Sequence, residues 1–191
     1  LTELYFKTTM KQGQSLDAFV TLNLSERLNF SVAYKGLSSL GKYVNNASSN
    51  GNFRFTTNYQ TTSGRYYFNM HLTSQDFLNG ENGGVADVEN FESKDGRYKD
   101  RARLSVYLTD AETLLEGNRY FFDHHFRINS KDSENNLLLD HQFIYENKYF
   151  RYDQTSLNTT VVTDGGQREF VRFGDSYVRN NLRDESRSNR M

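Results

Sequence analysis

His124 and His125 are the side chains in this sequence most suited to chemistry, and Asp123 directly precedes them. Two imidazoles and a carboxylate could hold a metal ion. In an extended strand, however, neighbouring side chains point to opposite faces, so His124 and His125 cannot bind one ion together. No ligand spacing specifies a site with His71 or His141. We therefore predict no metal and no cofactor. The alternative is a pH-responsive imidazole on a wetted surface.

A hydrolytic triad is the second candidate. Ser105, His125 and Asp140 fall on polar positions of three expected strands, but a nucleophile and its base must also be aligned in space. Ser and Thr are frequent at polar positions elsewhere in the sequence, so this set is not distinctive. We therefore predict that the protein is not an enzyme.

Carboxylates and glycines gather between Asp76 and Asp100, and such oxygen ligands could bind Ca²⁺. The spacing of an EF-hand is absent, so a solvated loop is the preferred interpretation. Gly41 and Lys42 lack the rest of a phosphate-binding pattern, so nucleotide binding is not supported.

The composition indicates a wall with one apolar and one wetted face. Aromatic residues make up 15% of the 191 residues, as 13 Tyr and 15 Phe with no Trp, yet apolar residues reach only 36%. A soluble domain usually carries about 45–50% apolar residues. Cys and Pro are absent, and the formal net charge of −1 leaves no basic surplus for a nucleic-acid partner. No run of about 18 apolar residues predicts a membrane-spanning helix.

Alternation of apolar and polar residues predicts strands through most of the chain. The clearest segments are 16–24, 28–35, 53–60, 66–73, 103–109, 120–128 and 137–146. Residues 1–10 and 149–153 predict two more strands, and 159–162 and 168–173 flank a hairpin turn at Asp164-Gly165-Gly166. The polar segment 178–191 is left without assigned structure.

Short turns at 25–27, 61–65, 110–118 and 146–148 alternate with longer loops at 36–51, 78–102 and 130–136. That order is typical of an antiparallel up-and-down transmembrane β-barrel, although soluble sandwiches, lipocalin-like barrels and jelly rolls also contain alternating strands. The fold class is therefore all-β, with about 9–10 strands.

Several stretches resemble the putative porins of the Bacteroidetes outer membrane. They are residues 13–19 (GQSLDAF), 30–43 (FSVAYKGLSSLGKY), 51–61 (GNFRFTTNYQT), 74–84 (SQDFLNGENGG) and 110–123 (DAETLLEGNRYFFD). The resemblance implies an outer-membrane location, membrane lipid as the principal partner and a passive channel for small hydrophilic solutes. It supplies no catalytic motif. Other outer-membrane subunits are further possible partners.

Each face of the expected wall then has a role. The lipid-facing set is Leu22, Val32, Phe55, Phe68, Val106, Phe126 and Phe143. The lumen-lining set is Asp17, Lys35, Arg54, Asn58, Arg103, Asp123, Arg127, Asp140 and Glu146. Both charge signs in this set predict weak ion preference, with the 78–102 loop favouring cations slightly.

Residues 1–191 are expected to form a single β-barrel region that is incomplete. The polar end of the sequence does not resemble a closing strand, and about nine strands is an odd number, whereas bacterial single-chain barrels have an even number. Two other functions stay open. One is a non-conducting barrel that serves as scaffold in a secretion or uptake complex, and the other is a soluble β-sandwich that binds glycans.

Overall fold

The fold is known from a computed structural model that describes residues 1–9, 12–129, 137–155, 158–163, 166–171 and 182–190. The strands are β1 (Thr2–Thr9), β2 (Gly13–Ser25), β3 (Leu28–Ser39), β4 (Ser48–Gln60), β5 (Tyr66–Glu81), β6 (Ala111–Arg127), β7 (Leu138–Gln154), β8 (Asn158–Thr163), β9 (Gly166–Val171) and β10 (Leu182–Arg190). The helical elements are α1 (Val88–Glu92), η1 (Gly96–Lys99) and η2 (Arg101–Arg103).

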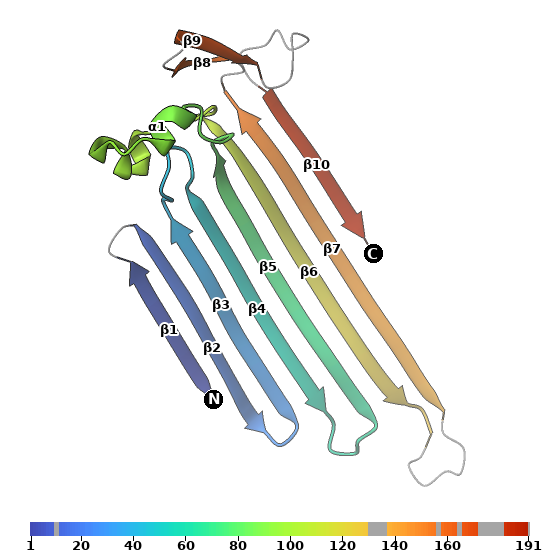
Figure 1. Cartoon of the computed structure of the whole chain (residues 1–191). Helices are drawn as coiled ribbons and strands as arrows, with labels where there is room; N and C mark the ends of the chain where they lie inside the picture. Colours follow the sequence, from blue (N-terminus) through green and yellow to red (C-terminus); the bar gives the residue numbers. More distant parts are fainter. Residues whose placement is uncertain (10–11, 130–136, 156–157, 164–165, 172–181, 191) are drawn as a thin grey trace.

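Eight strands form one antiparallel sheet in the order β1-β2-β3-β4-β5-β6-β7-β10 (Figure 1). Each of the first seven pairs with its neighbour in sequence, which is the up-and-down connection that the alternating pattern predicted. Within the described chain the sheet does not close, because β1 and β10 form its two edges. The all-β prediction is confirmed, and the open sheet is consistent with part of a barrel.

The two ends of the sheet differ in their connections. At the turn end, β2 and β3 are separated by residues 26–27, and β4 and β5 by residues 61–65, where Gly64 has a positive φ of 65°. At the loop end, residues 40–47 join β3 to β4, and residues 82–110 join β5 to β6. The expected loop at 130–136 lies outside the described residues.

Three predicted boundaries were wrong. Residues 103–109 do not form a strand, because they follow η2 and make only an isolated bridge between Val106 and Val85. We expected turns at residues 110–118 and 146–148. Residues 111–118 instead lie in β6, and residues 146–148 lie in β7. Their polar side chains pair across strands, as Arg119 does with Glu146 at 3.4 Å, so polarity there does not mark a turn.

The last residues of the sequence also acquire structure. Residues 182–190, which had no assigned structure, form β10 and pair with β7 from Gln154 to Glu146. β8 and β9 form a separate hairpin, with Thr163 opposite Gly166, as the sequence predicted. The rest of the turn, Asp164 and Gly165, lies outside the described residues.

The buried core lies beside the sheet rather than within it. Leu104, Val106 and Leu108 are almost completely buried, and all three belong to residues 82–110, called here the cap segment. On the sheet, large apolar side chains such as Leu22 and Phe143 are each 45% exposed. Among the described residues, no helix is both long and apolar enough to cross a membrane.

Candidate functional site

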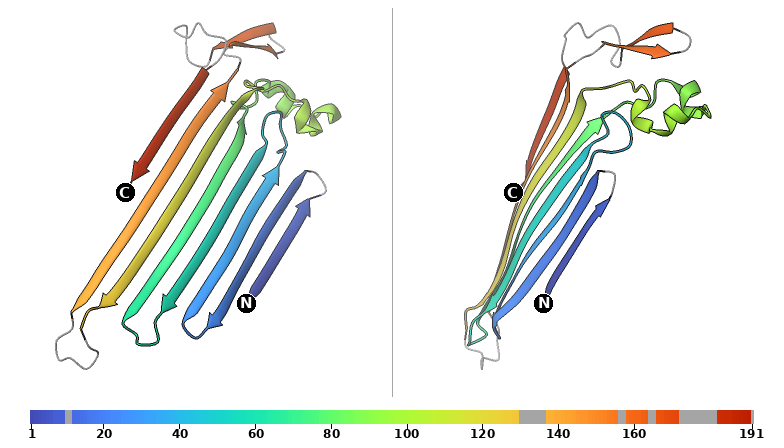
Figure 2. Two further views of the ribbon diagram at one scale, coloured as in Figure 1. Left: turned by 180° about the vertical axis from the view of Figure 1, so that it is seen from behind. Right: turned by 90° about the vertical axis from the view of Figure 1, so that its left-hand side faces the viewer.

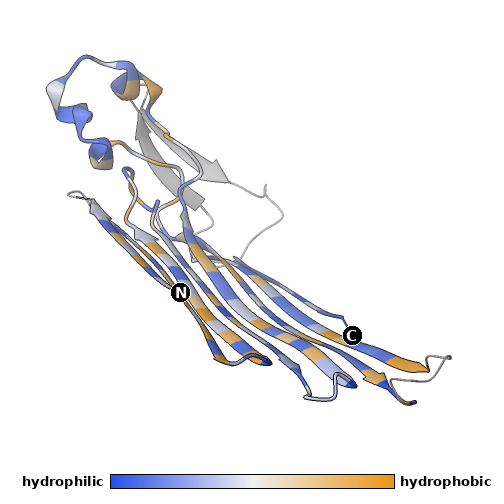
Figure 3. Cartoon of the chain, turned by 90° about the horizontal axis from the view of Figure 1, so that it is seen from below, coloured by the Kyte–Doolittle hydropathy of each residue, from blue (hydrophilic) through white to orange (hydrophobic). Residues whose placement is uncertain are grey.

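The strand register separates the sheet into two chemically different faces. Directly opposed residues in antiparallel strands project to the same side. Val32 lies opposite Phe55, Phe55 opposite Leu72, and Leu72 opposite Tyr120, which is in turn opposite Tyr145. We call the side that carries these residues the apolar face and the other the polar face. Hydrophobic and hydrophilic residues alternate visibly along several strands of the main sheet in Figure 3.

The two predicted sets fall on opposite faces of the sheet wherever the expected strand is a strand in the structure. Leu22, Val32, Phe55, Phe68, Phe126 and Phe143 all lie on the apolar face. Asp17, Lys35, Arg54, Asn58, Asp123, Arg127, Asp140 and Glu146 all lie on the polar face. Val106 and Arg103 are the corrections. They lie in the cap segment, where Val106 is 4% exposed, so neither is part of the wall.

The apolar residues of the apolar face form a band that runs obliquely across the strands. Within the continuous register of β2, which ends at the irregularity between Asn23 and Ser25, the band extends from Leu16 to Leu22. Its centre is Phe19, which the register aligns through β3–β6 with Glu146 of β7. On β7, however, the band extends from Leu139 to Tyr145 and is centred on Gln142. The band has therefore moved toward the turn end by the four residues that separate Glu146 from Gln142.

Toward the loop end, the apolar face becomes charged. Arg151 contacts Glu112 at 3.0 Å and Asp153 at 2.8 Å, and Arg183 contacts Asp153 at 2.6 Å. These residues lie beyond the band on β6, β7 and β10. The apolar face thus changes from hydrocarbon-like to ion-paired along the length of its strands.

The polar face carries ion pairs both between neighbouring strands and within β7. Lys35 lies 3.4 Å from Asp17, and Glu146 lies 3.4 Å from Arg119 and 3.7 Å from Lys148. A hollow of about 280 Å³ beside Gly117 is lined by Arg119, Glu146 and Lys148, among other residues. Because most of these charges are exposed and paired, the face is hydrophilic without a dominant sign.

The histidine pair divides between the two faces, as the strand geometry predicted. His124 Nε2 lies 3.2 Å from His141 Nδ1 on the apolar face. His125 contacts Asp140 and lies 3.1 Å from Asp123 on the polar face. Ser105 belongs to the cap segment at the loop end, whereas His125 lies near the turn end of β6, so the triad does not assemble. In the described part of the chain, no group of three or more His, Asp or Glu side chains is arranged to hold a metal ion.

The cap segment packs on the polar face at the loop end. Leu108 forms a buried cluster with Ala111 of β6 and Tyr152 of β7, both of which project to the polar face. Asn45, from the neighbouring loop, donates hydrogen bonds to the carbonyls of Glu81 and Ala111 at 3.0 and 2.9 Å. In the edge-on view of Figure 2, the helical part of the cap segment and the β1 edge lie to the same side of β6 and β7.

Carboxylates of the cap segment close its helical turns. Asp87, Asp95 and Asp100 accept backbone hydrogen bonds at the N-termini of α1, η1 and η2. The sequence signal for this role, an Asp just before each short helical turn, was available and was missed. Asp95 also accepts hydrogen bonds from Arg97, and these lower the pKa of its carboxyl group.

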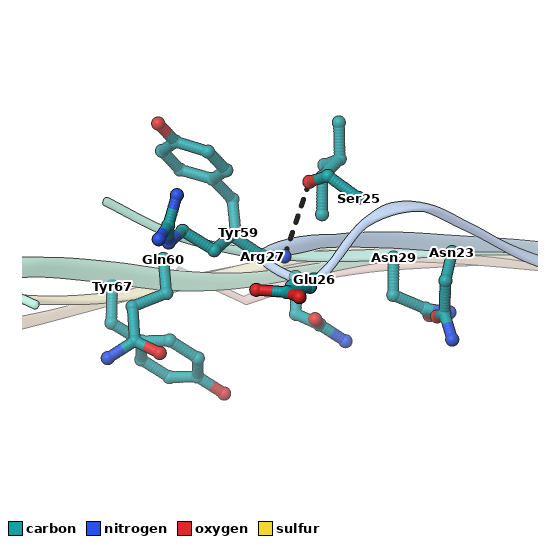
Figure 4. A pocket seen from close by; sticks show the side chains of 10 residues that line it. Asn23, Ser25, Glu26, Arg27, Asn29, Tyr59, Gln60 and Tyr67 are labelled. Carbon is teal, nitrogen blue, oxygen red and sulfur yellow. Dashed lines mark hydrogen bonds between the residues drawn. The ribbon is translucent and has the colours of Figure 1, made fainter. Parts of the chain in front are cut away.

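A second hollow, of about 360 Å³, lies at the turn end. Asn23, Asn29 and Tyr67 lie on one side of the sheet there, and Tyr59 points to the other side (Figure 4). Asn29 donates hydrogen bonds to Thr21 Oγ1 and to the Leu22 carbonyl, each at 3.2 Å. This end of the polar face therefore presents mainly uncharged hydrogen-bonding groups.

Comparison with known proteins gives one match. A family model described as "putative porin" matches residues 1–191, which is the whole chain. Neither the curated proteins nor the solved structures yield a match.

Proposed function

The chain belongs to the putative porin family, and we propose from this membership and from its two-faced sheet that it forms part of the wall of an outer-membrane channel for small hydrophilic solutes. The apolar face contacts lipid, and the polar face lines an aqueous lumen. The oblique apolar band is the observation that carries this proposal.

An oblique band is what tilted strands require. The hydrocarbon layer lies at a fixed height in the membrane. When the strands tilt, the residues at that height differ from one strand to the next by a constant number of positions. A shift of four residues between β2 and β7 amounts to about 14 Å along the strands over about 24 Å across them. The ratio corresponds to a tilt of about 30°, close to the roughly 35–45° of transmembrane barrels. This slope is the one expected when tilted strands close into a barrel.

The environment of the apolar face supports lipid as its surroundings rather than the interior of a soluble sandwich. Such a fold buries its apolar face against a second sheet. The eight strands of the main sheet form a single layer, and Phe126 and Phe143 remain 37% and 45% exposed. Lipid supplies the missing apolar contact, and the ion pairs around Arg151 mark where the apolar face leaves the hydrocarbon.

The two open edges imply additional wall. In hydrocarbon, unpaired backbone N–H and C=O groups cost several kcal/mol each, so only a closed ladder is stable. β10 pairs with β7 only from Gln154 to Glu146, and residues 138–145 of β7 have no described strand on that side. We infer that further strands join β1 and β7–β10 to close the barrel. A non-conducting scaffold would need the same closure, and no observation favours it over a channel.

The cap segment would narrow this lumen at the loop end, because Leu108 and Tyr107 pack on Tyr152 of the polar face. It carries six carboxylates and five basic residues, so its contribution to ion selectivity is small. Pore width, rather than charge, is therefore its expected effect on permeation.

The facing of the sheet can be tested by cysteine accessibility, since the chain has no native Cys. Phe55→Cys and Thr56→Cys are a matched pair, because they are neighbours on β4 at nearly the same depth and on opposite faces. In lipid vesicles, Thr56→Cys should react with a charged, water-soluble thiol reagent, and Phe55→Cys only with a lipid-soluble one. The reverse result, or equal labelling of a chain that is soluble without detergent, would overturn the proposal.

A further inference from the structure

A continuous row of five amides and one carboxylate crosses the polar face. In the register, Asn23 lies opposite Asn29, Asn29 opposite Asn58, and Asn58 opposite Asn69. The row continues to Asp123 and Gln142. Six successive strands, β2 to β7, thus each contribute one amide or carboxylate to a single line. Periodicity within any one strand does not reveal this alignment.

The adjacent row is also uncharged on its first three strands. Thr21, Ser31 and Thr56 lie opposite one another, one position nearer the loop end on the same face. The hydroxyls of Ser31 and Thr56 are 2.6 Å apart, and Thr21 Oγ1 accepts from Asn29. Amides and hydroxyls both donate and accept hydrogen bonds, so this patch can satisfy a ligand that does the same.

Aromatic faces complete the patch on β5 and β6. The His71 ring stacks on Phe121 with centroids 4.7 Å apart and an interplanar angle of 11°, next to Thr56 in its row. The Tyr67 ring stacks on His125 at 6.0 Å, and the Tyr67 hydroxyl donates to Asn69 Oδ1 at 2.6 Å. Flat rings beside amides offer an apolar surface and hydrogen bonds within reach of one ligand.

The amide row itself carries little formal charge, although His125 and Asp140 lie one position nearer the turn end, and Glu26 and Arg27 line the hollow there. Arg54, Arg119 and Glu146 lie together in a row nearer the loop end. Within the amide row, the one formal charge is on Asp123, and its Oδ2 is 3.1 Å from His125 Nε2. On β2–β5, where all four members of the row are Asn, a neutral solute would find uncharged hydrogen-bonding partners.

From this arrangement we propose that the amide row binds a neutral, polyhydroxylated chain, an oligosaccharide, on the polar face. Each sugar hydroxyl donates and accepts as an amide does, and the C–H faces of the rings pack on aromatic side chains. Adjacent amides are about 4.8 Å apart across the strands, so an extended ligand meets a new partner at each strand. The hollow at Asn23, Asn29 and Asn58 marks the turn end of the row.

The row would also guide the ligand across the membrane. It crosses the strands at right angles, whereas the apolar band slopes. On β7 the row lies at the centre of the band, at Gln142, but on β2 it lies at the edge of the band, at Asn23. A ligand that follows the row therefore moves from the turn end toward the middle of the bilayer.

This inference rests on the proposed function, because it needs the polar face to be wet. The test is calorimetric titration of the full chain, folded in detergent micelles, with maltohexaose as the neutral probe and hexagalacturonate as the charged one. We expect maltohexaose to bind more tightly than hexagalacturonate. Asn58→Ala should weaken maltohexaose binding about 5- to 10-fold, which corresponds to the loss of one or two neutral hydrogen bonds.

Asn52→Ala is the matched control. Asn52 is also an Asn on the polar side of β4, but it lies outside the row and donates to Gln75 Oε1 at 3.2 Å. Its substitution should leave affinity unchanged, and circular dichroism should show both variants folded. Absence of maltohexaose binding, tighter binding of the charged hexamer, or equal losses in the two variants would overturn the inference. If Thr56→Cys is also inaccessible to water-soluble reagents, the proposed function fails with it. If it is accessible, only the saccharide site fails.

Discussion

The sheet and the cap segment achieve stability in different ways. The cap segment has a small dry core in which Leu104 and Leu108 are 1% and 0% exposed. The sheet extends over far more residues, yet its large apolar side chains remain partly exposed, and its element contacts join only neighbouring strands. The cap segment buries its apolar side chains within the chain, whereas the sheet leaves many of its apolar side chains exposed.

Under the proposed function, this difference corresponds to a different solvent for each region. A segment that buries its own apolar residues is suited to water, where burial of a Leu side chain contributes roughly 1.5–3 kcal/mol. A sheet that keeps an apolar band exposed is suited to lipid, where backbone pairing within the wall is the essential requirement. Different kinds of substitution should therefore be costly in the two regions.

The largest effect is expected for Leu108→Ala. Leu108 packs against Ala111 and Tyr152, and truncating a buried Leu costs about 2–5 kcal/mol. The loss should be local and should release the cap segment while the sheet stays paired. Hydrogen exchange of the Leu108 amide, which donates to the Asn82 carbonyl at 2.9 Å, should accelerate strongly. Equal acceleration at Val32 would show that the two regions are not separate.

Val32→Arg should produce the next largest effect. Val32 lies within the apolar band, and an Arg that faces lipid near the bilayer centre costs about 2–4 kcal/mol. The free energy of unfolding from lipid vesicles in urea should fall by this amount. Asn58→Lys, on the opposite face, should change it much less. Similar losses in both variants would contradict the assignment of the faces.

Removal of most of the cap segment tests its role separately from that of the sheet, with ion conductance as the measured quantity. Ala86 and Ser105 are adjacent, since the Ala86 amide donates to the Ser105 carbonyl at 2.9 Å, so residues 87–104 can be replaced by an Asn-Gly turn. The closed barrel should then conduct better in a planar bilayer because the lumen is wider. Ion preference should hardly change, since the excised residues contain five carboxylates and five basic residues. A large change in ion preference with constant conductance would show that the segment acts through its charge.

The smallest expected effect is the loss of the Asp95–Arg97 interaction at acid pH. Hydrogen bonds from Arg97 hold the pKa of Asp95 below its ordinary value, so this pair contributes stability above the usual Asp range and loses it only as the pH falls through the lowered pKa. The Arg97 amide, which donates to Asp95 Oδ1 at 2.9 Å, should keep its NMR shift between pH 7 and 5 and move only in stronger acid. A midpoint above the usual Asp range would contradict the direction of the shift.

The sequence predicted correctly those features that depend only on the order of residues within one strand. Alternation placed Leu22 and Phe143 on one face and Asp17 and Glu146 on the other, because side chains in a strand alternate with a period of two. It failed at residues 103–109, where Leu104, Val106 and Leu108 alternate as a strand would but pack into the cap segment instead. Alternation over a short segment does not predict whether its apolar residues belong to a strand or pack in an irregular segment.

The amino-acid sequence by itself determined the two faces, the all-β class and the resemblance to porins, since each depends on local pattern or composition. Only the tertiary structure decided which residues align across strands. The slope of the apolar band and the row from Asn23 to Gln142 both depend on the register, which is set by hydrogen bonds between residues far apart in the chain. A shift of two residues in any one pairing would preserve every face and destroy both features.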